Sequence, residues 1–451
     1  MENTNIAIIG ASAAGLAAAL TLKMKSPETK VVLFRKVSRT PVPCGIPYIY
    51  GTLKEVAKDL IPDDPFTSMG LDIRIAEVTA IDTKNHELTF NGKEKLKYDK
   101  LLLTTGSIPI IPPIEGSDLE NVFAIKKEPE HLELINQRVK DAKDIVVIGG
   151  GFIGVEMAEQ VAKLKGDNAN ITIVEMLPHC LLVALEEEFC IRAEEELKKL
   201  NINIKTNSQV TKIEGNGKVE KVILASGESI AADVVIMGVG AAPNISLAEK
   251  AGIPCDKRGG IEVDEYMKTK VEDIYAAGDC ASKFSFVTKK PCGIRLASVA
   301  AYEGVIAANN MLGENIKNRG ALGAFATKIG DVSIAAAGLT QRACETENIE
   351  YVKGEFVAPD KHPATLPNTF MDMKAILLFN KKDKKIIGGH VLGGDTAAEM
   401  VNIISTAIQA GLTVEDIYFM QVATHPLLTG SPIAYHVLRA AGDAFFKFKN
   451  L

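Results

Sequence analysis

The stretch DIVVIGGGFIG at residues 144–154 decides the fold of this chain of 451 residues. Its first five residues form an apolar run typical of a buried strand, and Gly149, Gly151 and Gly154 follow in G-x-G-x-x-G spacing. The first glycine allows a tight turn, the second lets a pyrophosphate approach the backbone, and the third lets helix and strand pack closely. Because the helix expected at residues 154–165 would present free N–H groups to phosphates, we predict a dinucleotide site here.

An acidic residue completes this predicted site. The helix is followed by a short apolar strand at residues 171–174, and Glu175 stands at the end of that strand. A carboxylate there can accept hydrogen bonds from an adenosine ribose and would repel a 2′-phosphate, so we expect NADH in preference to NADPH. Ile153 and Glu156, in the first turns of the helix, are assigned to the same cofactor site.

The same strand–helix–strand arrangement occurs at residues 5–34, with a less regular loop. Gly10 and Gly15 keep their places, but Ser12 replaces the second glycine and Arg35 occupies the acid position. Taken alone, this loop fits a dinucleotide site and a plain βαβ turn equally well. An arginine cannot accept a hydrogen bond from ribose, so Arg35 would stack on adenine or pair with a phosphate. Two such units predict an α/β fold with two Rossmann-type nucleotide-binding domains.

Composition and charge exclude several classes of protein. The chain is 47% hydrophobic and 24% charged, as in an ordinary globular protein, and its net charge of -6 without a long basic run argues against a nucleic-acid partner. No apolar stretch approaches the length of a membrane span, so no membrane association is predicted. Seven cysteines without a C-x-x-C pair argue against a disulfide framework or a zinc ribbon and favour the cytoplasm; no metal site is predicted.

Patterns of β-forming residues predict further strands. A hairpin is expected at residues 73–90, and two strands are expected within residues 221–238. Beyond about Gly323, several strands followed by a helix at residues 396–410 predict an α+β region without a nucleotide signature.

Three further segments indicate which dinucleotides are bound. Residues 269–279, TKVEDIYAAGD, resemble the flavin motif T-x-x-x-x-φ-φ-A-x-G-D, whose final aspartate, here Asp279, binds the ribityl chain. Residues 98–106, YDKLLLTTG, are similar to the A-T-G crossing from an FAD domain to an NAD domain, and residues 240–244, GAAPN, are similar to the G-R-x-P-N return. With these motifs in order, the chain resembles the FAD- and NAD(P)-dependent pyridine nucleotide–disulfide oxidoreductases over essentially its whole length.

This resemblance implies a glutathione-reductase-like architecture and a homodimer. The FAD domain would be split between residues 1–110 and 245–322, the NAD domain would span residues 111–244, and residues 323–451 would form an α+β dimerisation domain. Besides the NAD loop, the resemblance assigns cofactor contacts to Gly10, Ser12, Gly15, Arg35, Lys36, Pro43, Val78, Thr105, Gly106, Gly240, Gly278 and Asp279.

Cys44, in the segment PVPCGIPY at residues 41–48, decides the subclass. Members with two redox cysteines carry C-x-x-x-x-C, but Ile49 stands at the second position here. The segment is similar instead to the single-cysteine branch: coenzyme A-disulfide reductases, NADH-dependent persulfide or polysulfide reductases, and NADH oxidases and peroxidases. Pro43 and Gly45 suit a turn into a helix N-terminus, which would favour a thiolate. The alternative is a small buried apolar residue, the role expected of the other six cysteines.

A few positions divide this branch. Its peroxidases and oxidases usually carry a histidine in the first glycine loop, where this chain has Ala13. Its coenzyme A-disulfide reductases carry polar and basic side chains on the first helix, where only Lys23 and Lys25 supply charge here. His425, in THPLLT, is similar to the histidine that dithiol members bring from the partner subunit, with Gly430 in place of the orienting glutamate. A His-Pro that merely ends a loop is the equal alternative.

The predicted function is an FAD enzyme that passes electrons from NADH through the flavin and Cys44 to a small disulfide, persulfide or polysulfide, with coenzyme A derivatives as the leading case. His425 is the candidate acid–base residue. The first alternative is an NADH oxidase or peroxidase in which Cys44 cycles through a sulfenic acid. The second is a flavin-binding protein without turnover, indicated only by Ser12 and Arg35.

Overall fold

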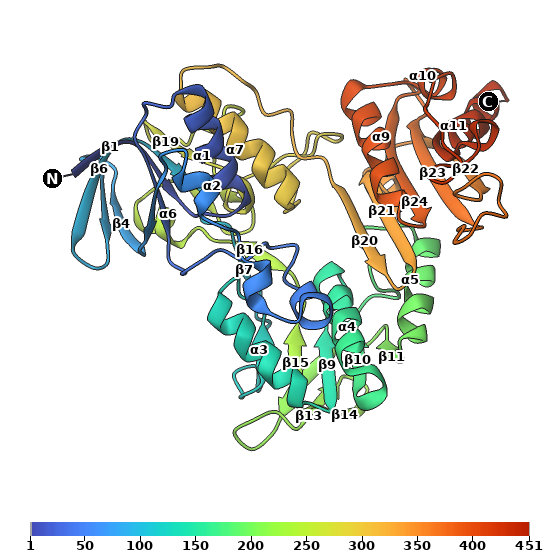
Figure 1. Ribbon diagram of the computed structural model, residues 1–451, viewed down its shortest axis with the longest axis horizontal. Helices are drawn as coiled ribbons and strands as arrows, with labels where there is room; N and C mark the ends of the chain where they lie inside the picture. Colours follow the sequence, from blue (N-terminus) through green and yellow to red (C-terminus); the bar gives the residue numbers. More distant parts are fainter. Residues whose placement is uncertain (1, 451) are drawn as a thin grey trace.

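The computed structural model describes residues 2–450, which form three regions built around three main sheets (Figure 1). The first region contains the N-terminus, the second lies below it in the view of Figure 1, and the third carries the C-terminus. Within residues 2–450, no helix is long and apolar enough to cross a membrane.

The first sheet has seven strands, six of them in the order β3-β2-β1-β6-β5-β4, with the seventh, β19, paired to β6. The strands are β1 (Glu2–Ile9), β2 (Val31–Arg35), β3 (Asp72–Ile75), β4 (Val78–Asp82), β5 (Glu87–Phe90), β6 (Glu94–Leu103) and β19 (Ile274–Ala276). The central strands are parallel and apolar, as expected for a sheet that is covered on both faces. The hairpin predicted at residues 73–90 is correct only for β4 and β5, because β3 pairs in parallel with β2.

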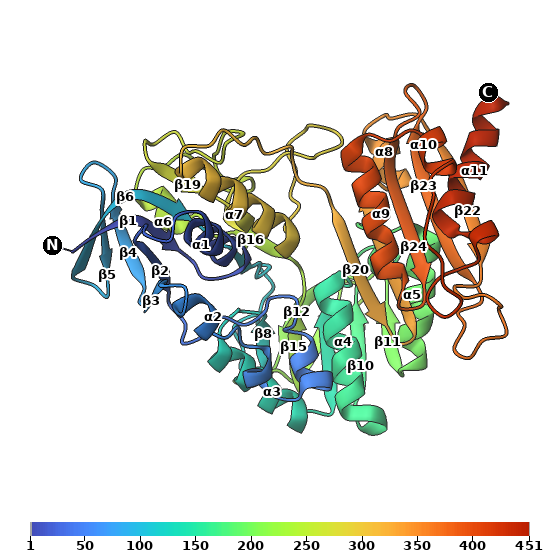
Figure 2. The same ribbon diagram turned by 45° about the horizontal axis from the view of Figure 1, so that its top comes forward.

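Two helices from distant parts of the chain pack together on this sheet. They are α1 (Ala13–Lys25) and α7 (Ala297–Met311), and Figure 2 shows them side by side. Small residues permit the close crossing, since a Cβ on Gly304 would lie only 2.2 Å from the carbonyl oxygen of Ala14. The first sheet and its helices thus combine two segments that lie far apart within the first 311 residues of the chain.

The second region holds a parallel sheet of strand order β11-β10-β9-β15-β8. Its strands are β8 (Val122–Ala124), β9 (Asp144–Ile148), β10 (Asn170–Val174), β11 (Ile202–Lys205) and β15 (Val234–Met237). Its helices are α3 (Pro129–Asp141), α4 (Phe152–Lys165) and α5 (Glu187–Lys199). The β9–α4–β10 unit is the strand–helix–strand arrangement predicted from residues 144–174, although α4 begins two residues earlier than expected.

A small antiparallel sheet lies beside this one and corrects one prediction. It consists of β12 (Val210–Glu214), β13 (Lys221–Leu224) and β14 (Ser229–Ala231). Together with β15, residues 221–238 therefore contain three strands rather than the predicted two. The chain reverses in a tight turn, where the N–H of Gly227 donates to the carbonyl of Leu224 at 2.9 Å.

Two short strands carry the chain between the first and second regions. β7 (Ser107–Pro109) and β16 (Ala241–Pro243) pair antiparallel, so the outward and return crossings lie side by side. The segment between β2 and β3 also leaves the first sheet. It contains η1 (Ile49–Leu53), a π-helical turn, and η2 (Val56–Asp59), a 3₁₀ turn, followed by the short helix α2 (Asp64–Thr67). η1 lies against α4 and η2 lies against α3, in the part of the second region where Figure 1 shows these two helices.

The third region is an α+β unit with an antiparallel sheet of order β20-β21-β24-β23-β22. Its strands are β20 (Ala324–Ile329), β21 (Val332–Gly338), β22 (Tyr351–Ala358), β23 (Met373–Asn380) and β24 (Ile386–Gly393). Its helices are α8 (Gln341–Thr346), α9 (Ala397–Ala410), α10 (Val414–Tyr418) and α11 (His436–Lys449). α9 agrees with the helix predicted at residues 396–410. One face of the sheet shares a core with the second region and with the turns around η1.

Candidate active site

The loop between β9 and α4 has the geometry of a phosphate cradle. Gly149 has a φ of +103°, which L side chains rarely adopt, and a Cβ on Gly154 would lie 1.9 Å from the carbonyl oxygen of Gly149. Gly151 is the N-cap of α4, and a Cβ there would meet no atom within 4 Å. Ile153 is exposed in the first turn of α4. Because the backbone is open at the helix N-terminus, these residues fit a pyrophosphate.

Glu175 lies where the sequence places the ribose acid. Its carboxylate accepts hydrogen bonds from the N–H of Gly150 at 2.5 Å and of Leu177 at 2.8 Å, which hold it beside the glycine loop. The ring of His179, whose charge could offset that of Glu175, lies instead against Glu194, with Nδ1 3.3 Å from Oε2. This arrangement suits a 2′-hydroxyl better than a 2′-phosphate, and the preference for NADH stays a prediction.

The loop between β1 and α1 forms a similar cradle. Gly10 has a φ of +114°, and a Cβ on Gly15 would lie 1.9 Å from the Gly10 carbonyl oxygen. Ser12 is the N-cap of α1, and its side chain makes no capping hydrogen bond to the helix. The N–H groups of the first turn are therefore left for a ligand, and the loop fits a second dinucleotide.

Arg35 already has a partner in this structure. Its buried guanidinium donates to both carboxylate oxygens of Asp63, at 2.5 and 2.6 Å, and to the carbonyl of Ser38 at 2.6 Å. The neighbouring Lys36 is exposed and pairs with Glu128, the N-cap of α3, at 2.6 Å. The predicted cofactor contacts of Arg35 and Lys36 stay predictions. A cavity of about 420 Å³ opens here, lined by Lys36, Val37, Ser38, Glu77, Glu128 and Glu130.

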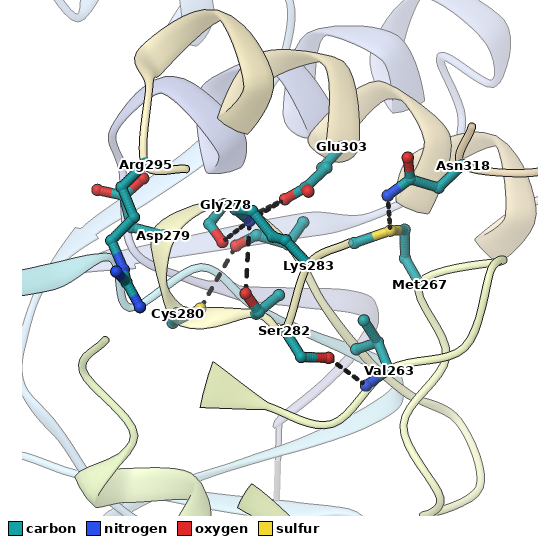
Figure 3. Close-up of polar contacts among 12 residues, drawn as sticks. Val263, Met267, Gly278, Asp279, Cys280, Ser282, Lys283, Arg295, Glu303 and Asn318 are labelled. Carbon is teal, nitrogen blue, oxygen red and sulfur yellow. Dashed lines mark hydrogen bonds and ion pairs between the residues drawn. The ribbon is translucent and has the colours of Figure 1, made fainter. Parts of the chain in front are cut away.

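A buried ion pair holds the loop of Gly278 and Asp279 from inside (Figure 3). Lys283 Nζ lies 2.6 Å from Glu303 Oε2 on α7, and the two side chains are only 3% and 1% exposed. The Gly278 N–H donates to Glu303 at 2.9 Å, and Lys283 donates to the Gly278 carbonyl at 2.6 Å. Burial raises the pKa of Glu303, and Lys283 opposes this rise. Both backbone groups of Gly278 are thus fixed, which positions Asp279.

Asp279 faces the crossing between the first and second regions. Its Oδ2 accepts a hydrogen bond from Ser107 Oγ at 2.8 Å and lies 3.8 Å from Lys127 Nζ. The side chain is only partly exposed. A carboxylate held in this way keeps lone pairs free for hydroxyl donors, as a contact to the ribityl chain of FAD requires.

Thr105, Gly106 and Gly240 shape the same crossing. Thr105 Oγ1 donates to the carbonyl of Asn244 at 2.6 Å, and the Asn244 N–H donates to the carbonyl of Gly106 at 2.9 Å. Gly106 and Gly240 both have positive φ, at +70° and +101°. The structure therefore joins the motifs at residues 98–106 and 240–244 that the sequence shows far apart.

Cys44 lies in the turns between β2 and η1, in the segment that leaves the first sheet. Cys44 is exposed, whereas the other cysteines within residues 2–450 are buried or half-buried. Partial burial of the sulfur raises the pKa of the thiol, the carboxyls of Glu156, Asp279 and Asp59 add to the rise, and Lys127 opposes it. The charges that act on the Cys44 thiol therefore come from the loop of Asp279, from α4, which carries Glu156, and from η2, which ends at Asp59. Pro43, directly before it, is half-buried.

The predicted turn into a helix N-terminus is present at Cys44, but the helical segment that follows is short and starts after the thiol. Residues 43–47 form successive turns, and the next helical turn, η1, begins only at Ile49 and has five residues. The surroundings of Cys44 do not favour its thiolate, because burial and the neighbouring carboxyls raise the pKa of the thiol.

Glu156 links α4 to the third region beside Cys44. Its Oε1 accepts a hydrogen bond from Thr327 Oγ1 on β20 at 2.8 Å. Burial raises the pKa of Glu156 to about 7, an effect that Thr327 opposes. Near neutral pH this carboxyl is therefore divided between its two protonation states, as a group that exchanges protons must be. Its predicted contact with a cofactor stays a prediction, as does that of Val78, which is buried in the first sheet.

His425 makes no hydrogen bond to Cys44 within the described chain. It is exposed in the loop between α10 and α11, and its Nδ1 accepts a hydrogen bond from the N–H of Leu427 at 3.3 Å. The proton of the neutral ring then resides on Nε2, so the backbone provides the orientation for which a glutamate is lacking. His362 packs on the same loop, with Nδ1 3.0 Å from the carbonyl oxygen of Thr429.

Several residues of this site had no signal in the sequence. Asp63, Ser107, Lys127, Lys283 and Glu303 belong to no motif, and only the fold brings each of them to a motif residue. A reversed charge at the position of Arg35 was the one available hint, since a buried arginine requires an acid nearby. Within residues 2–450, no group of three or more histidine, cysteine or acidic side chains could hold a metal ion.

Comparison with known proteins identifies the family. Residues 4–304 match the pyridine nucleotide-disulphide oxidoreductases, and residues 325–433 match the dimerisation domain of that family. The chain belongs to the pyridine nucleotide-disulphide oxidoreductases. It is an oxidoreductase that uses FAD and NAD(P)H, and the predicted fold class is confirmed.

The relatives include proteins named as reductases and proteins named as oxidases. The chain is 32% identical over 428 residues to the NAD(P)H coenzyme A polysulfide/persulfide reductase of Pyrococcus horikoshii, covering 93% of this chain and 94% of the relative. It is 32% identical over 454 residues to the NADH oxidase of Methanocaldococcus jannaschii, covering 98% and 99%. The enzyme is therefore an NAD(P)H-dependent flavoprotein of the coenzyme A persulfide/polysulfide reductase or NADH oxidase type.

Two solved structures extend this comparison. A NAD-dependent persulfide reductase from A. fulgidus has a TM-score of 0.91 and 29% identity, and the alignment covers 99% of this chain and 84% of that one. The reduced CoADR-RHD protein of Bacillus anthracis has a TM-score of 0.92 and 28% identity, covering 100% and 81%. All three regions of the chain are thus shared with these reductases.

Proposed function

We propose that this enzyme reduces a low-molecular-weight persulfide, polysulfide or disulfide with electrons from NADH, using Cys44 as its single redox cysteine. One observation carries the proposal: the Cys44 residue is exposed, and the carboxyls of Glu156 and Asp279 both raise the pKa of its thiol. Ile49, at the position of a second redox cysteine, is buried in the core. A redox thiol without a partner thiol forms its disulfide with the substrate.

The reaction follows from these groups. Bound FAD supplies two electrons that arrive as the hydride of NADH. Glu156 accepts the proton of the Cys44 thiol, and the thiolate attacks a substrate sulfur, so that a Cys44–S–S–R bond forms and the substrate S–S bond breaks. The second substrate sulfur leaves as a thiol or hydrogen sulfide after taking up a proton. Two electrons then cleave Cys44–S–S–R, a proton goes to the released R–S⁻, and the Cys44 thiolate is restored.

The names of the relatives support coenzyme A persulfides as the leading substrate class. Helix α1, however, offers less charge to a phosphate-rich substrate than the sequence suggests. Lys23 is buried and donates to the carbonyls of Pro27 and Thr29 at 2.9 and 3.0 Å, and Lys25 lies 3.7 Å from Glu314. We therefore propose that the S–S bond is the recognised feature and that coenzyme A is one carrier of it.

We further propose a homodimer in which the third regions meet. The match to a dimerisation domain supports this assembly, and a second copy would remove exposed apolar surface from water. That surface includes the side chains of Phe419, Leu427, Leu428, Ile433 and Phe446. Since His425 lies in the same loop, dimerisation would bring the partner subunit's His425 toward Cys44 as a proton donor to the leaving sulfur. The free thiols favour the reducing cytoplasm as the location.

Replacing the thiol tests the proposal. With Cys44→Ser, NADH is expected to reduce the bound flavin while turnover with coenzyme A persulfide, polysulfide and coenzyme A disulfide is lost, because serine cannot form a disulfide. Stopped-flow flavin absorbance and anaerobic NADH consumption measure the two half-reactions. Cys292→Ser is the matched control, because Cys292 is half-buried and is not assigned to the site. Full acceptor turnover by Cys44→Ser would overturn the proposal.

NADH oxidation by oxygen is the second candidate. Relatives named NADH oxidase favour it, including the protein from Methanocaldococcus jannaschii, whereas Ala13 stands where such enzymes usually carry a histidine. An oxygen electrode decides between the candidates. Cys44-dependent conversion of oxygen to water, with no turnover of any sulfur acceptor, would establish the oxidase and exclude the reductase.

A further inference from the structure

Asp59 is a buried acid that none of the steps above uses. It is the last residue of η2, is only 4% exposed, and its Oδ2 has no hydrogen-bond partner within the described chain. An unpaired buried carboxyl lowers the stability of a fold, and such groups in native proteins call for an explanation in strain, bound water or function. Its surroundings connect it to the Cys44 turn.

The Asp59 carboxyl packs against the backbone next to Cys44. A Cβ built on Gly45 would lie 1.8 Å from Asp59 Oδ1 and 2.9 Å from its Cγ. The two segments are also joined by their main chains, because the Val42 N–H donates to the Asp59 carbonyl at 2.8 Å. The carboxyl therefore fills the space that any side chain at position 45 would need, which explains the glycine after the cysteine.

The same carboxyl acts electrostatically on the thiol. Asp59 raises the pKa of Cys44, with a smaller effect than burial, Glu156 and Asp279. Burial raises the pKa of Asp59 itself to about 6, so that it is largely ionised at neutral pH. Other titratable groups interact electrostatically with this pair. Tyr48, Lys127, Glu156 and Asp279 interact with Cys44, and Tyr50 interacts with Asp59 and with Glu133.

We propose that Asp59 is a positioning residue for Cys44: its carboxyl fills the space beside Gly45 and holds the turn that presents the thiol. Above about pH 6 the ionised carboxyl repels the thiolate, and below that pH the neutral acid only supports the turn. The consequence for turnover rests on the proposed function, whereas the effect on the thiol does not.

Alkylation of Cys44 tests the electrostatic part. The rate of carboxamidomethylation of Cys44 in the FAD-loaded enzyme is followed against pH by mass spectrometry. Asp59→Asn keeps the shape of the side chain and removes its charge, so the midpoint is expected to fall and alkylation near neutral pH is expected to become faster. Glu55→Gln, an exposed acid four positions earlier, is the matched control and is expected to leave the midpoint unchanged. An unchanged midpoint in flavin-loaded Asp59→Asn would overturn the proposal.

A double-mutant cycle tests the contact itself. Gly45→Ala is expected to slow alkylation or displace its midpoint, and adding Asp59→Ala is expected to restore most of the wild-type behaviour by making room for the methyl group. Additive effects of the two substitutions would show that the contact does not position the thiol. If Asp59→Asn shifts the midpoint while Cys44→Ser retains acceptor turnover, the positioning role stands and the proposed function fails.

Discussion

The two glycine loops of this enzyme have the same backbone conformation but differ in the charge of the residue at the end of the following strand. Gly10 and Gly149 both have φ above +100°, and each loop opens a helix N-terminus. At the second loop, Glu175 is held by N–H groups of its own βαβ unit. At the first, Arg35 reverses the charge and Asp63, from a segment outside the sheet, neutralises it. The two loops thus share their glycine geometry, whereas the residue at the end of the next strand gives each loop a different charged neighbour.

The largest effect is expected on the flavin side, from Lys283→Met. This change leaves the buried carboxylate of Glu303 unpaired and releases the Gly278 carbonyl, which is expected to lower the free energy of unfolding by about 3–5 kcal/mol and to release FAD. Thermal unfolding and the flavin absorbance after gel filtration measure the two effects. Lys270→Met, which removes an exposed pair with Glu262, is the matched control. Retained FAD and an unchanged Tm would contradict the anchoring of Gly278.

Asp63→Asn tests the neutralisation of Arg35. The hydrogen bonds from Arg35 hold the pKa of Asp63 below its usual value. A lowered pKa in the folded state stabilises the protein above the unfolded pKa, near 4, and that contribution is lost as the pH falls through the folded pKa. The variant is therefore expected to lose about 1–3 kcal/mol at pH 7 and to show a shallower loss of stability below about pH 4. Urea unfolding at several pH values measures the free energy of unfolding. If it falls below pH 4 as steeply in the variant as in the wild type, the prediction is refuted.

Glu175→Ala is expected to act on the other loop. Loss of the carboxylate removes a charge-assisted hydrogen bond to the ribose, so kcat/KM for NADH is expected to fall about tenfold, while the value for NADPH rises as the repulsion disappears. Steady-state kinetics with both nucleotides checks the two directions. A wild-type enzyme that prefers NADPH would show that Glu175 does not face the 2′ position.

The smallest effect is expected from Lys36→Ala. Its pair with Glu128 is partly exposed, and such pairs contribute less than about 1 kcal/mol. Thermal unfolding is therefore expected to change little, while equilibrium titration of the apoprotein with FAD reports any contact between Lys36 and the cofactor. Equal FAD affinity in the variant and the wild type would remove Lys36 from the predicted binding residues.

Most of the fold was predictable because its signals are local. The glycine loops, the apolar strands beside them and the helix at residues 396–410 follow from short-range periodicity and backbone demands. The errors have local causes as well. β3 pairs in parallel with β2 rather than in a hairpin, and only a short helical segment follows the turn at Cys44. The strand count within residues 221–238 was wrong because one tight turn splits the expected run.

The sequence by itself predicted the two glycine loops, the flavin-like motif ending in Asp279 and Cys44 as the candidate redox cysteine, because each prediction depends on residue types at fixed short spacing. Only the tertiary structure decided which acids act on the Cys44 thiol. They include Glu156, which accepts a hydrogen bond from Thr327, and Asp59, whose carboxyl packs against Gly45. These contacts join segments that lie far apart in the chain. Their strength comes from burial, which gives the acids their raised pKa values, and no local pattern of residues encodes burial at a junction between sheets.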